Sequence, residues 1–142
     1  MLIVAILIGH GLQRLRPLSF LPEWLAGTEG VAGPVVVGLA MLIFALSFRT
    51  LRRAGFTIGG KTPSTLLLKS GPYRWSRNPM YLAMIAFIAG RAIWLNNAWL
   101  VVLGGTFVTL LRYTVINKEE AHLERKFAEE YPQYKASVRR WL

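Results

Sequence analysis

Two adjacent carboxylates, Glu119 and Glu120, stand directly after a long apolar stretch of the sequence. A carboxylate in this position can hold a cationic ligand or a ribose, and it can take a proton from an amine. It can equally neutralise the basic segment 49–79, which contains seven Lys and Arg residues and no acid. The residues alone leave both interpretations open, and both carboxylates are candidate catalytic groups.

Aromatic side chains accompany these charges. They are Tyr73, Trp75, Tyr81, Tyr131, Tyr134 and Trp141. Each one alone fits the band of Trp and Tyr found at membrane surfaces. As a group they can stack on an adenine ring and attract a sulfonium or another cation within about 6 Å. The combination favours a charged nucleoside cofactor.

Two prolines mark the backbone beside these aromatic residues. Gly71-Pro72 bends the chain, and Asn78-Pro79 predicts the start of a helix. The first N–H groups of a helix have no partner inside that helix, so they suit a bound carboxylate.

Two arginines lie inside apolar stretches, Arg91 near the end of one and Arg112 about one turn before the end of another. An ionisable residue at membrane depth is a functional candidate, but a long Arg near a helix end can also extend to the membrane surface. We interpret Arg91 in the second way. Arg112 is retained as a third candidate catalytic residue, because its helix leads into Glu119.

The elements that must position these groups are membrane helices. Of the 142 residues, 54% are hydrophobic, and they form long apolar runs. The net charge of +10 does not indicate nucleic-acid binding, because these runs interrupt the basic residues. With no Cys and only two His, the sequence predicts no metal site.

The apolar runs predict about four transmembrane helices in a single all-α domain that covers residues 1–142. The predicted spans are about 1–14, 31–48, 80–95 and 98–116, and the last two are joined by a turn at Asn96-Asn97. The first span is short, and we expect it to be retained, because no positive residue precedes it as in a signal peptide.

Charge predicts the orientation. The segment 49–79 is strongly basic and is therefore expected in the cytoplasm, while the last two spans return the tail 117–142 to the same side. The tail has an apolar and aromatic stripe typical of a helical cap, with Pro132 expected to break it into two helices. We expect an integral membrane protein, in the inner membrane of a bacterium.

Several short motifs stand in a particular order around the last two spans. They are Gly71-Pro72-Tyr73-Arg74, Arg77-Asn78-Pro79-Met80-Tyr81, Glu119-Glu120 with Leu123 and Phe127, and Glu130-Tyr131 followed by Tyr134, Val138 and Arg139. In this order the chain resembles the isoprenylcysteine carboxyl methyltransferase and phospholipid methyltransferase superfamily over about residues 49–142. The resemblance is to the bacterial or archaeal type of membrane methyltransferase in this superfamily.

The resemblance implies an enzyme that transfers a methyl group from S-adenosylmethionine to a lipid-like or membrane-dissolved acceptor. It also implies a cofactor site on matching positions of this chain. These are Thr65, Leu66, Leu67, Leu68, Tyr73, Arg77, Asn78, Pro79, Met80, Tyr81 and Glu119, with Glu120 beside them. Membrane lipids are the expected surroundings, and neither the acceptor nor the oligomeric state follows from the sequence.

Two positions depart from the isoprenylcysteine enzymes. Asn78 stands where those enzymes have a His, so no titrating role is expected there. Val115 stands where they have an Arg for the substrate carboxylate, and Arg112 lies one turn earlier. Recognition of a prenylcysteine carboxylate is not predicted.

Two other functions are compatible with the pattern. A membrane reductase of the sterol-reductase type would use NADPH, but the short tail and the lack of a further Gly-rich turn do not favour a dinucleotide. A non-catalytic membrane protein would bind anionic lipid through the basic segment, at about 1 kcal/mol per nearby Lys or Arg. That function leaves the order of the motifs unexplained.

Overall fold

The computed structural model describes residues 1–25, 27–56 and 67–141, and over these residues the chain is helical without strands. This confirms the all-α prediction for the described part of the chain. The α-helices are α1 (Leu2–Leu15), α2 (Glu29–Arg53), α3 (Pro79–Trp94), α4 (Ala98–Leu111), α5 (Asn117–Lys126) and α6 (Glu130–Ser137). Short helical segments are η1 (Glu23–Leu25), η2 (Gly71–Arg74) and the π-helical η3 (Arg112–Ile116).

The chain forms two compact units. The first unit contains Met1–Leu42 and Ala83–Leu110, and the second contains Ile43–Leu82 and Leu111–Leu142. Both α2 and α3 contribute residues to each unit.

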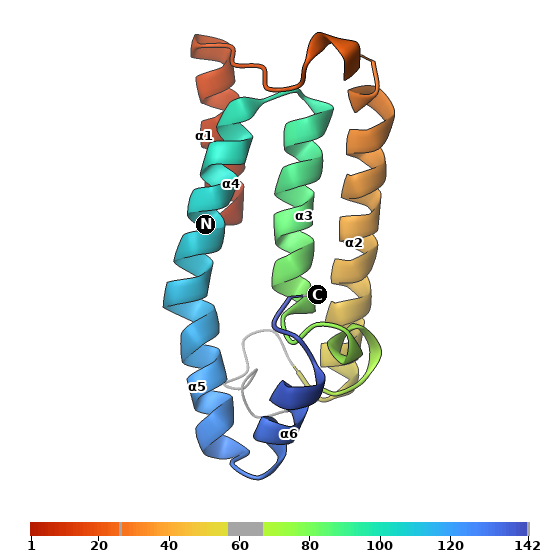
Figure 1. Ribbon diagram of the computed structural model, residues 1–142, viewed down its shortest axis with the longest axis vertical. Coiled ribbons are helices and arrows are strands. Elements are labelled where there is room, and N and C mark those ends of the chain that lie inside the picture. Colours follow the sequence, from red (N-terminus) through yellow and green to blue (C-terminus); the bar gives the residue numbers. More distant parts are fainter. Residues whose placement is uncertain (26, 57–66, 142) are drawn as a thin grey trace. The chain divides into compact units, whose positions relative to one another are not determined.

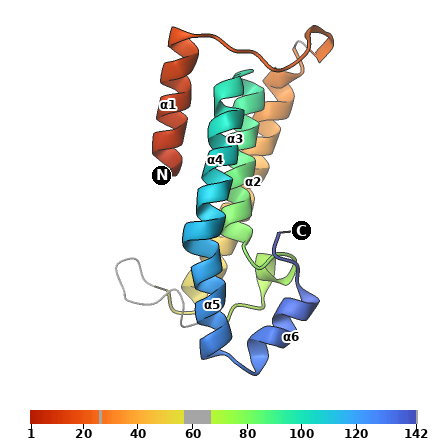
Figure 2. The same cartoon turned by 60° about the vertical axis from the view of Figure 1, so that its left-hand side comes forward.

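In the first unit, α3 and α4 lie side by side and are joined by a tight turn (Figures 1 and 2). Asn96 and Asn97 lie in this turn, where the sequence predicts one. Asn96 adopts a positive φ of 43°, and its side-chain oxygen accepts hydrogen bonds from the backbone N–H groups of Phe20 and Leu21, both at 3.0 Å. Asn97 is fully buried and donates to the carbonyl of Gly9. The turn therefore holds α1 and the segment after it.

Close approach of helices in the first unit depends on glycine. A Cβ on Gly33 of α2 would lie 2.4 Å from the Cα of Trp94 in α3, which is closer than side chains allow. Small residues bring helix backbones together in membrane proteins, where lipid leaves little hydrophobic drive for association.

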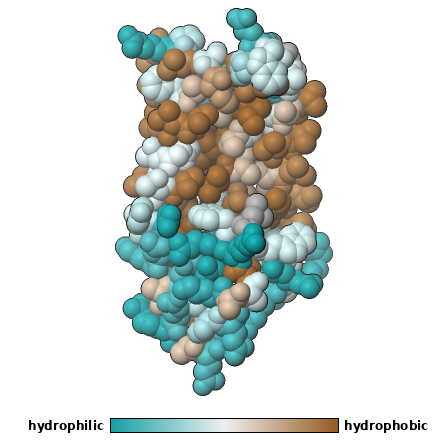
Figure 3. Space-filling model, viewed as in Figure 1, coloured by the Kyte–Doolittle hydropathy of each residue, from teal (hydrophilic) through white to brown (hydrophobic). Residues whose placement is uncertain are grey.

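Two helical stretches are long and apolar enough to cross a membrane, namely Glu29–Arg53 and Ala98–Lys126. The apolar helices Leu2–Leu15 and Pro79–Trp94 are shorter, so the arrangement of four spans stays a prediction. Large apolar side chains such as Val31, Met41 and Val102 are 60% exposed or more. Figure 3 shows hydrophobic residues gathered over α2 and α3, and hydrophilic residues over α5 and α6. Exposed apolar helices of this kind are suited to lipid.

In the second unit, a glycine fixes the segment before α3. Gly71 begins η2 with a φ of +58°, and a Cβ there would lie 2.7 Å from the Thr50 hydroxyl oxygen. Only glycine meets both conditions without strain. The start of α3 at Pro79 agrees with the predicted position, because proline is well suited to the first turn of a helix.

The tail forms two helices, but the expected cause of the break is wrong. α5 ends at Lys126 and α6 begins at Glu130, while Pro132 lies in the first turn of α6. Proline is tolerated in a first turn, because the N–H that it lacks would have no partner inside the helix. The chain turns instead at Phe127, which leaves the helical conformation with φ −118° and ψ 54°.

Candidate functional site

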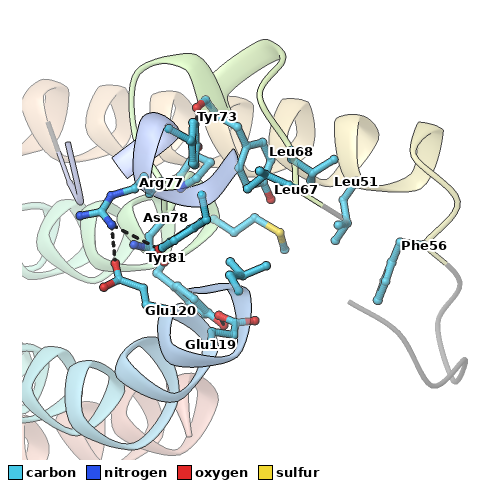
Figure 4. Close-up of a pocket in the computed structure, with 15 residues that line it drawn as sticks. Leu51, Phe56, Leu67, Leu68, Tyr73, Arg77, Asn78, Tyr81, Glu119 and Glu120 are labelled. Carbon is cyan, nitrogen blue, oxygen red and sulfur yellow. Dashed lines mark hydrogen bonds and ion pairs between the residues drawn. The ribbon is translucent and has the colours of Figure 1, made fainter. Parts of the chain in front are cut away.

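A cavity of about 260 Å³ lies within the second unit (Figure 4). Its lining combines apolar, aromatic and charged side chains. The lining residues are Leu51, Phe56, Leu67, Leu68, Tyr73, Arg77, Asn78, Pro79, Met80, Tyr81, Glu119, Glu120, Leu123, Tyr131 and Tyr134. The cavity is close to the lower end of the usual range for small-molecule sites, about 300 to 1,000 Å³.

Most of the residues singled out in the sequence line this cavity. Leu67 and Leu68 precede η2, Tyr73 lies within it, and the segment 77–81 leads from it into α3. Glu119 and Glu120 come from the first turn of α5. Thr65 and Leu66 lie outside the described residues.

Arg112 lies apart from the cavity lining. Its side chain is exposed, and its guanidinium lies 5.8 Å from the ring centre of Tyr113. Arg112 lies in η3, one residue after the end of α4, and the other predicted residues of the described chain gather without it.

Glu119 is held by a phenol. The Tyr81 hydroxyl donates a hydrogen bond of 3.0 Å to a carboxylate oxygen of Glu119, and Figure 4 shows the two side chains pointing toward one another. Among the residues that the structure describes, no Lys or Arg forms an ion pair with Glu119. This carboxylate therefore keeps an oxygen for a ligand.

Glu120 has a different environment. It is 7% exposed, and its carboxylate receives two hydrogen bonds from the Arg140 guanidinium, of 2.6 and 3.1 Å. The Arg77 guanidinium lies 3.3 Å from one of the same carboxylate oxygens. Two cations flank one buried carboxylate, so charge pairing describes Glu120.

Arg77 is the link between this ion pair and the rest of the lining. Its side chain is 9% exposed, and it also donates a hydrogen bond of 3.3 Å to the Tyr131 hydroxyl. Its buried Nε has no hydrogen-bond partner among the described residues. A buried donor without an acceptor is unfavourable by about 1 to 3 kcal/mol, so a ligand that supplies an acceptor would be stabilised there.

The chain end closes on the segment before α3. Ser76 and Asn78 both donate side-chain hydrogen bonds of 3.2 Å to the Arg140 carbonyl, and the Arg77 N–H donates to the Arg139 carbonyl at 3.0 Å. Asn78 is thus engaged with the backbone of the tail. We call the segment 139–140 with its partners 76–78 the tail clasp.

Arg140 is the residue that the sequence did not single out. A buried carboxylate needs a cation, but 17 Lys and Arg residues offered no means of choosing between them. The only indication in the sequence is that Arg140 directly follows Arg139, the last residue of the motifs that carry the family resemblance.

Tyr73 and Tyr134, two of the cavity's tyrosines, have raised pKa values. Burial raises the pKa of both Tyr73 and Tyr134 to about 12, so each phenol keeps its proton at neutral pH. The Tyr134 hydroxyl donates a hydrogen bond of 2.7 Å to the Tyr73 carbonyl, which fixes α6 to η2. Aromatic faces and protonated hydroxyls are thus held in place around Glu119.

Comparison with known proteins gives a family. A family model described as phospholipid methyltransferase matches residues 28–130, a range that includes Tyr81, Glu119 and Glu120. A protein of Haemophilus influenzae, described as an uncharacterized protein, is 42% identical over 65 residues, which are 44% of this chain and 100% of that protein. No solved structure matches the chain. The family match confirms the resemblance inferred from the motifs.

Proposed function

The chain belongs to the phospholipid methyltransferase family, and on that premise we propose that it transfers a methyl group from S-adenosylmethionine to a lipid-like or membrane-dissolved acceptor. The family is one of methyltransferases with lipid-related substrates, and the long apolar helices agree with a membrane protein. The cofactor, the acceptor and the cytoplasmic placement of the cavity belong to the proposal.

One observation supports the proposed methyl transfer most directly. Glu119 is a carboxylate held by Tyr81 and not paired with a cation among the described residues, and it lines a cavity with several aromatic and apolar side chains. A nucleoside presents ribose hydroxyls, which are donors for a carboxylate, and an adenine, which is a flat apolar surface for tyrosine and leucine. The residues present fit S-adenosylmethionine in this respect.

The amino-acid end of the cofactor has suitable partners too. Met80 and Tyr81 lie in the first turn of α3, where backbone N–H groups have no partner inside the helix. Together with the buried Nε of Arg77 they are donors for a carboxylate. When bound, S-adenosylmethionine supplies an electrophilic methyl group on a sulfonium.

The chain's own contribution is to bind and orient. Holding two reactants in contact can lower a barrier by roughly 7 to 11 kcal/mol, and no nucleophilic side chain is needed. A carboxylate or thiolate acceptor arrives charged and needs only partial loss of water. An amine acceptor must lose a proton, and in this proposal Glu119 accepts it.

The test is calorimetric titration of the detergent-purified protein with S-adenosylhomocysteine. We expect micromolar binding by the wild type, and a loss of tenfold or more in Glu119→Gln, because the amide gives up the charge that strengthens hydrogen bonds from ribose hydroxyls. Tyr81→Phe keeps the ring and removes the hydroxyl that orients Glu119, so we expect a smaller loss of about fivefold.

Glu124→Gln is the matched control. Glu124 lies on the same helix, is exposed, pairs with Lys135 at 2.6 Å and does not line the cavity. It should bind as the wild type does. Equal affinity in Glu119→Gln and Glu124→Gln would reject the site, and no binding by a folded wild type would reject the cofactor.

A further inference from the structure

A second polar cavity lies within the first unit, at the ends of α1 and α3. Its volume is about 610 Å³, and it opens to the surface. It is lined by Leu7, His10, Gly11, Gln13, Arg14, Arg91, Leu95 and Asn97, and we call it the basic cavity. The lining contains two arginines and no acid.

Arg91 is anchored but not neutralised. Its guanidinium contacts His10 Nε2 at 2.8 Å and lies 5.5 Å from the ring centre of Trp94. Since a guanidinium has no acceptor, Nε2 of His10 must be the acceptor, which places the imidazole proton of a neutral His10 on Nδ1. Within the described residues, neither Arg91 nor Arg14 forms an ion pair with a carboxylate.

Gln13 adds donors to the cavity, while Asn97 is already engaged with the backbone. Gln13 uses its side-chain oxygen to accept from the Leu18 N–H, which leaves its amide N–H groups as the groups it can offer. Asn97 uses its amide on the Gly9 carbonyl and its oxygen on the Leu100 N–H. A cavity with two guanidinium groups and an amide is suited to a negatively charged ligand with several acceptor oxygens.

We propose that the basic cavity binds the phosphate group of a membrane phospholipid. Guanidinium groups match phosphate oxygens in geometry and charge. A lipid is favoured over free phosphate because apolar side chains adjoin the donors: Leu7 lines the cavity and is 65% exposed, and Leu95 lines it and is 39% exposed.

The surroundings also indicate the depth of a lipid head group. Trp94 is 40% exposed beside Arg91, and Trp99 donates its indole N–H to the Arg16 carbonyl at 2.8 Å. Trp residues concentrate where a membrane meets water, which is the level of the phosphates. The site is separate from the proposed cofactor cavity and does not depend on methyl transfer.

The test is titration of the detergent-purified protein with dihexanoyl phosphatidylglycerol, a short-chain phospholipid. We expect saturable binding that weakens at least tenfold in Arg91→Gln and in Arg14→Gln, since hydrogen bonds to charged groups are lost. Arg91→Lys keeps the charge without the planar fork and should weaken binding about threefold.

Arg16→Gln is the matched control. It removes the same charge two residues from Arg14, at a position that does not line the cavity, and it should change the affinity less than about twofold. Equal losses in all three glutamine variants would overturn the proposal, because net charge alone would then explain them. A melting temperature close to that of the wild type would show that Arg91→Gln is folded, and Arg91→Lys tests the site if it is not.

Two further probes separate the ligand classes. Dihexanoyl glycerol has the same chains without phosphate, and equally tight binding of it would overturn the role of the arginines. Inorganic phosphate has the anion without chains, and equally tight binding of it would overturn the lipid. Weak binding of both, with tight binding of the phospholipid, is the expected result.

Discussion

The two cavities hold arginine in opposite ways. In the second unit, Arg77 and Arg140 flank the buried Glu120, so their charge is largely met by the protein. In the first unit, Arg91 contacts a histidine nitrogen and an aromatic ring, and Arg14 lines the same cavity. Among the described residues, neither forms an ion pair with a carboxylate. The ion pairs in the second unit stabilise the protein itself, whereas the arginines in the first unit keep their charge for a ligand. The buried carboxylate of Glu120 is thus the feature that separates the two arrangements.

The two units also differ in what holds them. The first unit contains close approaches of helix backbones at glycine, such as Gly33 at Trp94, while the second contains the nearly buried ion pairs of Glu120. Substitutions that remove charge should therefore destabilise the second unit most, and substitutions that add volume should destabilise the first.

The largest expected effect is on the ion pair of Glu120. Glu120→Gln leaves the nearly buried Arg77 guanidinium and the partly exposed Arg140 guanidinium facing an amide, and we expect the free energy of unfolding to fall by about 3 to 5 kcal/mol. Thermal unfolding of the detergent-purified protein should show a melting temperature lower by roughly 10 °C or more.

The exposed Glu124→Gln is its control and should leave the melting temperature nearly unchanged, because a surface ion pair contributes little. Equal shifts in the two variants would contradict a stabilising role for the buried carboxylate.

An intermediate effect is expected from added volume in the first unit. In Gly33→Ala the new methyl group meets the backbone of Trp94, so we expect a loss of about 1 to 3 kcal/mol in the free energy of unfolding. Chemical denaturation of this variant and of the wild type measures the loss of stability.

Gly38→Ala is the matched change on the same helix, where a Cβ meets nothing within 4 Å. It should be neutral or stabilising by up to about 1 kcal/mol, because alanine is the better helix former. A Gly33→Ala protein as stable as Gly38→Ala would mean that α2 and α3 are not in the close contact described.

The smallest effect concerns pH. Tyr73 and Tyr134 have pKa values raised to about 12 in the folded protein, above the usual 10.0 for tyrosine. Above pH 10 the unfolded chain loses these protons first, so unfolding is increasingly favoured as the pH rises toward 12. Melting temperatures measured between pH 8 and pH 11 should be level at first and then fall.

Tyr134→Phe should make this fall shallower, at a modest loss of stability at pH 8, since the hydrogen bond to the Tyr73 carbonyl is removed. An unchanged pH profile in Tyr134→Phe would assign the fall to other groups.

The sequence predicted the helical class, the start of α3 at Pro79 and the turn at Asn96-Asn97, because apolar runs, prolines and asparagines act locally. It also brought Glu119 and the segment 77–81 together on the strength of family motifs. It could not distinguish the two carboxylates. Their difference depends on Arg140, which is 20 residues from Glu120 and reaches it only because the chain turns at Phe127.

In general, the sequence does not predict contacts between residues that lie far apart along the chain. His10 and Arg91 are 81 positions apart, and no periodicity or motif pairs them. The interpretation of Arg91 as extending to the membrane surface stays a prediction, and its contacts with His10 and Trp94 are not predicted by the sequence.

The tail clasp also sets an order of events during biosynthesis. Ribosomes make a chain from its N-terminal side toward its C-terminal side, so Ser76, Asn78 and Glu120 exist well before Arg140, their shared partner. Until Arg140 has been added, the buried carboxylate has only one of its two guanidinium groups. The contacts of Glu120, which lines the cavity beside Glu119, are therefore completed only after Arg140 has been added, when the apolar helices have already been made.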